Sequence, residues 1–140
     1  MRRFPNEPAS IPGVRRFVRA ALAEVEPELR ARAELVVSEL ATNALRHGAG
    51  DLLVAVLVER GRVRIEVADA SPALPLARRP GPDDPGGRGM LVVDALSQAW
   101  GVEPAGEARG GKVVWVTLAP DEDGTATTGP ASGRGGVPEG

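Results

Sequence analysis

The sequence contains no cysteine and no tyrosine, and aromatic residues make up only 3% of its 140 residues. The absence of cysteine excludes disulfides, iron–sulfur clusters and thiolate zinc sites, and it suits a cytoplasmic protein. A strong charge of one sign is also missing, since the formal net charge is −2. Proteins that bind nucleic acid usually carry a concentrated basic excess, so we expect no nucleic-acid partner.

Long hydrophobic runs are absent as well. No apolar stretch approaches the ~20 residues that a membrane-spanning helix needs, and the first ten residues lack the apolar segment of a signal peptide. We therefore expect a cytoplasmic protein with no membrane contact. The hydrophobic content of 42% is nevertheless sufficient for a core.

Periodic patterns occupy the chain up to about residue 119. The remaining segment, residues 120–140, is rich in Gly, Pro, Ser and Thr, and such a segment cannot bury enough apolar surface to offset its ordering entropy. We predict one domain over residues 1–119 and a disordered tail over residues 120–140.

Apolar residues at helical spacing predict three helices. The expected bounds are about Pro12 to residues 24–26, Pro27 to about His47, and residue 88 or 89 to Ala99. Proline in a first turn and glycine after a last turn support these assignments, because Gly48 follows the second helix.

Two strands follow the second helix. Residues 52–58 are almost continuously apolar and residues 62–68 alternate, with Gly61 between them as the turn of a hairpin. Residues 113–118 predict a last strand, paired with a short one near residues 100–102. This order predicts an α/β (α+β) two-layer sandwich, in which about three helices cover one face of a mixed, mainly antiparallel sheet.

The segment between the hairpin and the third helix breaks the pattern. Residues 71–87 contain five prolines and three glycines. Loops of this length inside a domain are usually functional or mobile.

Glu39 and Asn43 stand one turn apart at the edge of the apolar stripe of the second helix, and His47 continues the row. Spacing alone leaves two interpretations. Glu39 pairs with Arg32, Arg46 or solvent, or it acts as a general base beside an Asn43 amide oxygen that holds Mg²⁺. His47 fits a helix-end residue that complements the helix dipole, because one histidine makes no metal site.

Asp69 falls on the same face of its strand as Val63, Ile65 and Val67. An inward carboxylate costs several kcal/mol unless it is hydrogen-bonded. Its partner is either a protein donor or the amino group of a ligand, for which the exocyclic amine of adenine would serve.

The motif GGRGM, Gly86 to Met90, leads into the third helix. Backbone N–H groups at a helix start, with no side chains that block approach, favour phosphate.

A second glycine motif, Gly106 to Lys112, has the G-x-x-x-x-G-K spacing of a P-loop. However, Val113 stands where a P-loop has Ser or Thr, and the motif precedes a strand rather than a helix. We interpret it as a turn between strands.

These elements together resemble the GHKL (Bergerat-fold) ATP-binding superfamily of histidine kinases, gyrase-type ATPases and Hsp-type chaperones. SELATNALRHG resembles the N box, VADASP the first glycine box and GGRGM the second. The resemblance implies Glu39 as the catalytic base, Asn43 as the Mg²⁺ ligand and Asp69 as the adenine-reading carboxylate.

The same resemblance makes residues 71–87 a lid over the phosphates and adds Gly87, Arg88, Gly89 and Met90 of the second box to the cofactor-binding residues. The amides of Gly87 and Gly89 would hold the phosphates, and Arg88 would touch a phosphate or face a partner. One departure concerns the closing strand, where Lys112 or Val113 stands in place of a threonine that the superfamily often has near the adenine.

Within the superfamily the chain is most similar to stand-alone anti-sigma-factor serine/threonine kinases of actinobacterial type. The similarity implies ATP and Mg²⁺ as cofactors, a sigma factor and a STAS-domain anti-anti-sigma protein as partners, and a homodimer. The implied activity is phosphorylation of a serine on the STAS protein. The alternative is a non-catalytic ATP-binding module that acts by nucleotide-dependent protein binding.

Overall fold

The computed structural model describes residues 1–71, 85–105 and 111–120, and for residues 85–89 the backbone alone. The expected tail and most of the expected lid lie outside these residues. The elements in chain order are β1 (Arg2–Phe4), α1 (Ser10–Ala21), α2 (Pro27–His47), β2 (Leu52–Glu59), β3 (Arg62–Asp69), α3 (Pro85–Leu96), β4 (Ala99–Pro104) and β5 (Lys112–Leu118).

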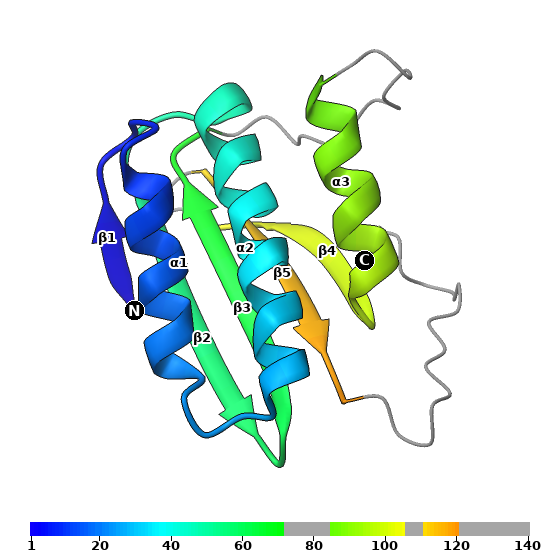
Figure 1. Cartoon of the computed structure of the whole chain (residues 1–140). Coiled ribbons are helices and arrows are strands. Elements are labelled where there is room, and N and C mark those ends of the chain that lie inside the picture. Colours follow the sequence, from blue (N-terminus) through cyan, green and yellow to red (C-terminus); the bar gives the residue numbers. More distant parts are fainter. Residues whose placement is uncertain (72–84, 106–110, 121–140) are drawn as a thin grey trace.

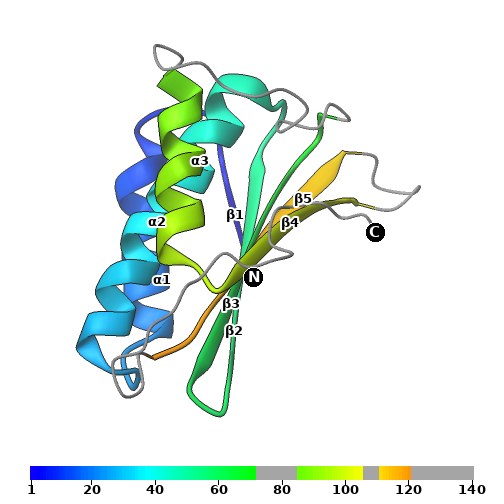
Figure 2. The ribbon, with the colours of Figure 1, turned by 90° about the vertical axis from the view of Figure 1, so that its right-hand side faces the viewer.

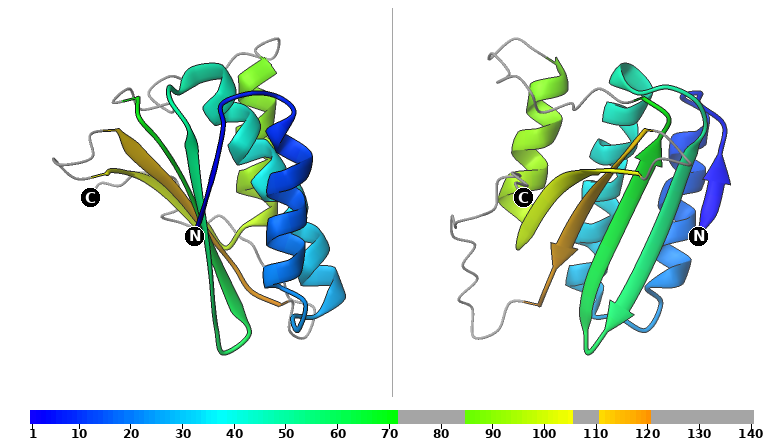
Figure 3. Two further views of the ribbon diagram at one scale, coloured as in Figure 1. Left: turned by 90° about the vertical axis from the view of Figure 1, so that its left-hand side faces the viewer. Right: turned by 180° about the vertical axis from the view of Figure 1, so that it is seen from behind.

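The five strands form one sheet in the order β1-β2-β3-β5-β4, and every neighbouring pair is antiparallel. All three helices lie on one face of this sheet (Figures 1 and 2). The other face carries none of the described helices (Figure 3). The predicted two-layer sandwich is thus confirmed, with a sheet that is antiparallel throughout rather than mixed.

The β2–β3 hairpin closes through the two residues Arg60 and Gly61, between the paired residues Glu59 and Arg62. Both turn residues have positive φ, 53° at Arg60 and 80° at Gly61. This is the two-residue hairpin geometry whose twist matches that of the strands, and glycine adopts it without steric cost. The local sequence therefore sets the register of β2 against β3.

The core lies between the sheet and the helices, with α2 in the middle. The buried apolar residues of α2 face the inward positions of β3 and β5. These positions alternate with exposed or half-buried ones, except at Ala68 near the end of β3, which is also buried. The predicted stripe of α2 is buried as expected: Leu29, Ala33, Val36, Val37, Leu40 and Ala44. No helix in the described part of the chain is both long and apolar enough to cross a membrane.

Several elements differ from the sequence prediction. Helix α1 ends at Ala21, before the predicted residues 24–26, and the guanidinium of Arg30 donates to carbonyls in the turn that follows it. Helix α3 spans Pro85–Leu96 instead of running from residue 88 or 89 to Ala99. Its earlier start is in keeping with the suitability of proline for a first turn, and Ala99 is the first residue of β4. Strand β1 was not predicted, because three residues carry no periodicity.

Candidate functional site

Helix α2 carries Glu39 and Asn43 on successive turns. The side chain of Glu39 is half-buried, and no ion pair or side-chain hydrogen bond joins it to another residue that the structure describes. Arg32, one of its expected partners, donates to the carbonyl of Ala119 at 3.0 Å. Among the described residues Glu39 thus forms neither of the two expected ion pairs, with Arg32 or with Arg46, which leaves contact with solvent or a role as general base.

Asn43 is only 6% exposed. Within the described ranges its amide makes no side-chain hydrogen bond. The fully covered side-chain N and O atoms that lack a partner in the described part of the chain are Ser97 Oγ and Trp115 Nε1. The amide atoms of Asn43 are therefore still reached by solvent, and a ligand can reach them too. An amide oxygen is a suitable protein ligand for Mg²⁺, which commonly takes few protein ligands and completes its shell with water and phosphate. The residue present thus fits the expected metal.

Asp69 is the last residue of β3, and its carboxylate faces the helices as its phase predicts. It accepts hydrogen bonds from the ammonium of Lys112, at 2.9 Å to Oδ1 and 2.8 Å to Oδ2. The backbone N–H of Ser71 donates to Oδ1 at 2.7 Å. Of the two predicted kinds of partner for Asp69, the structure contains the protein donor.

Lys112 is the first residue of β5 and the Cα partner of Asp69 across the β3–β5 ladder. Directly opposed residues of antiparallel strands project from the same face, so both side chains point toward the helices. Their exposed fractions are 2% for Lys112 and 1% for Asp69. In the sequence, Lys112 is the last residue of the G-x-x-x-x-G-K motif and a departure from a family pattern, and neither feature predicted its contact with Asp69. Lys112 stands two and four residues before Val114 and Val116, so the alternation of a strand would have placed its side chain on the same inner face.

The end of α2 is packed directly against Asp69. A Cβ atom on Gly48 would lie 2.5 Å from Asp69 Oδ2, so only glycine allows this approach. The N–H of Ala70 also donates to the carbonyl of Ala49 at 2.7 Å, which holds the chain after α2 to the end of β3. Asn43 lies about one turn before this contact, and the two predicted site residues Asn43 and Asp69 are therefore at the same end of the fold.

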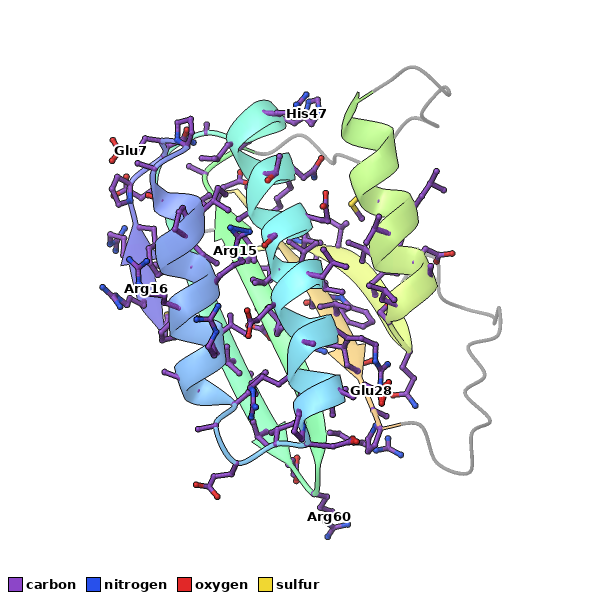
Figure 4. All side chains as sticks on the ribbon, viewed as in Figure 1. Glu7, Arg15, Arg16, Glu28, His47 and Arg60 are labelled. Carbon is purple, nitrogen blue, oxygen red and sulfur yellow. The ribbon has the colours of Figure 1, made fainter. Side chains whose placement is uncertain are left out.

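Helix α3 begins at that end too (Figure 1), where His47 marks the last turn of α2 (Figure 4). The structure places residues 86–89 inside the first turn of α3, not in a loop before it. The first N–H groups of an α-helix have no acceptor within the helix and suit an anion. Met90 is buried, with 8% exposure, and His47 is exposed.

The fold, with its three helices on an antiparallel sheet, is consistent with the Bergerat fold. The chain matches the family model described as the histidine kinase-like ATPase domain over residues 4–118, and it therefore belongs to this family. That match includes Glu39, Asn43, Asp69 and Lys112. No curated protein matches the sequence. Domains of this family bind ATP, generally with Mg²⁺.

Proposed function

We propose that this domain is a serine/threonine protein kinase of the anti-sigma-factor type. It would use ATP and Mg²⁺ to phosphorylate a serine of a STAS-domain antagonist, and it would sequester a sigma factor. The observation that carries the catalytic part is the pair Glu39 and Asn43, one turn apart on α2 and both without a side-chain partner among the described residues. The two partner proteins are proposed from the resemblance of the sequence motifs to those kinases.

Glu39 provides the general base in this proposal. Its carboxylate is half-buried and is not neutralised by a nearby described cation, so it remains available to accept a proton. The serine Oγ forms a bond to the γ-phosphorus as the bond from that phosphorus to the bridging oxygen breaks. The serine proton passes to Glu39, and ADP leaves.

Asn43 would hold the metal through its amide oxygen. Mg²⁺ bound there supplies positive charge that offsets the negative charge of the phosphates. The backbone N–H groups in the first turn of α3 add hydrogen-bond donors for an anion at the same end of the fold. The chain itself therefore provides a base, one metal ligand and anion donors.

Glu39→Gln tests the base. The wild type and the variant are incubated with γ-labelled ATP, Mg²⁺ and the STAS protein, and transferred label is measured beside ATP affinity. Removal of a general base typically lowers the rate by roughly 10²–10⁴-fold, whereas ATP affinity should change little. Glu28→Gln is the matched control, because Glu28 is an exposed glutamate in the first turn of the same helix.

Two other outcomes separate the alternatives. If the wild type binds ATP and transfers no label, the domain is a regulatory module that acts through nucleotide occupancy. Transfer at the wild-type rate by Glu39→Gln would overturn the assignment of the base.

A further inference from the structure

The buried pair of Asp69 and Lys112 has hydrogen-bonding capacity that its own contacts do not use. A carboxylate has about four acceptor positions and an ammonium has three donors. Asp69 accepts three hydrogen bonds, two of them at Oδ1 and one at Oδ2. Lys112 donates two, both to Asp69, and no third acceptor lies among the described residues. One acceptor position at Oδ2 and one N–H of Lys112 remain.

An acceptor next to a donor is the complement of one particular edge of a purine. Adenine has a 6-amino group that donates and, beside it, N1 that accepts. Asp69 Oδ2 and Lys112 Nζ are 2.8 Å apart, so the two atoms lie side by side, close enough for neighbouring polar atoms of one base edge. The pair can therefore contact both atoms of that edge at once.

We propose that Lys112 is a base-reading residue, which donates to N1 of adenine while Asp69 accepts from the 6-amino group. This inference rests on the proposed ATP site and extends it to the way in which the base is selected. Lys112 is joined to Asp69 by strand register and by two hydrogen bonds. The ammonium is thus held in position before any nucleotide arrives.

The same arrangement rejects guanine in that orientation. Guanine presents O6 where adenine has its amino group, and O6 would face the carboxylate of Asp69. Its N1 carries a proton, which would face the ammonium of Lys112. Both contacts are unfavourable, because one acceptor would face another acceptor and one donor would face another donor in a buried site.

The covered position of the pair affects all purines alike. With exposed fractions of 2% and 1%, the pair must lose part of its cover before a base can reach it. That rearrangement has the same cost for adenine analogues of equal size. It therefore cancels when the affinities of two such analogues are compared.

The experiment measures binding of the wild-type chain to ATP, 7-deaza-ATP and 1-deaza-ATP by isothermal titration calorimetry in excess Mg²⁺. The 7-deaza compound keeps the amino group and N1, and it is the matched control. The 1-deaza compound replaces N1 by C–H. We expect 7-deaza-ATP to bind like ATP and 1-deaza-ATP to bind roughly 10- to 100-fold more weakly, the scale of one lost hydrogen bond to a charged group.

Lys112→Met supplies the second measurement. In this variant the ratio between the affinities for 7-deaza-ATP and 1-deaza-ATP should fall to about one, because the donor to N1 is gone. The ratio is the readout, since a structural effect of the substitution would lower both affinities together. If the variant does not fold, the wild-type ratio still decides.

The possible results are distinct. Equal binding of the two analogues by the wild type overturns the role of Lys112 and leaves the ATP site intact. The role of Lys112 is also overturned if a folded Lys112→Met protein keeps the wild-type ratio between the affinities for 7-deaza-ATP and 1-deaza-ATP. Absence of binding to ATP itself would overturn the proposed function together with this inference.

Discussion

Two ion pairs in this domain have nearly the same geometry and very different surroundings. Arg19 on α1 and Glu34 on α2 form two hydrogen bonds, of 3.0 and 2.9 Å. Asp69 and Lys112 also form two, of 2.9 and 2.8 Å. The first pair lies at the surface, where its side chains are 57% and 20% exposed, and the second pair is almost fully covered.

The difference in burial decides what each pair does. A surface pair is weakened by water and by salt, and its loss leaves two solvated charges. A buried pair has lost its hydration, so removing one partner leaves a charge with nothing to replace water. We conclude that the surface pair only supports the contact of α1 with α2, whereas the buried pair sets the arrangement of the strand ends at the site.

The largest expected effect comes from breaking the buried pair. Lys112→Met leaves the Asp69 carboxylate covered and uncompensated, which typically lowers the free energy of unfolding by about 3–5 kcal/mol. Urea unfolding followed by circular dichroism measures this loss.

The double variant Lys112→Met with Asp69→Asn is the control for that prediction. It removes both charges, and it should recover much of the lost stability because no unpaired charge remains. If the double variant is as unstable as the sum of the two single variants, the two residues do not act as a pair.

The next effect tests how closely α2 approaches the buried pair. Gly48→Ala places a Cβ atom 2.5 Å from Asp69 Oδ2, and overpacking of this kind costs about 1–3 kcal/mol. The same urea experiment measures it. Gly13→Ala on α1 is the control, since its added Cβ would meet its nearest neighbour, in Phe4, at an ordinary 3.4 Å. Equal free energies of unfolding for Gly48→Ala and the wild type would contradict the close contact.

The smallest effect concerns the surface pair. The hydrogen bond from Arg19 lowers the pKa of Glu34 from its ordinary value of 4.5, although partial burial acts in the opposite direction. A carboxyl whose pKa is lower in the folded state stabilises the fold above its unfolded pKa, and that contribution is lost as the pH falls through its folded pKa.

Glu34→Gln therefore should lower the melting temperature slightly at neutral pH and at low salt. The difference from the wild type should begin to shrink as the pH falls below 4.5, and it should vanish only when the pH is below the lowered pKa of the folded state. It should also shrink in high salt, because exposed charges are screened. Thermal unfolding at several pH values measures it. If the difference instead grew toward acid pH, folding would raise the pKa of Glu34 rather than lower it, and the prediction would be wrong.

Much of the fold could be predicted because its signals are local. The bounds of α2 were predicted at both ends, since Pro27 suits a first turn and Gly48 follows the last one. The hairpin turn at Gly61 was also predicted, because a glycine between two strand patterns is a local signal for a tight turn. Strand β1 could not be found, because it exists only through its pairing with residues 52–54 of β2.

The candidate site also combines features that the sequence could predict with features that it could not. Helical spacing was sufficient to place Glu39 and Asn43 on one side of α2, and alternation predicted that Asp69 faces inward. Sequence could not show that Arg32 turns instead to the carbonyl of Ala119, 87 residues away. Nor could it show which group satisfies Asp69.

The sequence by itself determined the helices, the hairpin and the inward phase of Asp69, because periodicity and turn chemistry act over a few neighbouring residues. Only the tertiary structure decided that Lys112, 43 residues further along the chain, is the partner of Asp69. Strand register fixes that contact, and register depends on how distant segments pack together. The contact between Asp69 and Lys112 is thus a feature of the site that the sequence motifs alone did not predict.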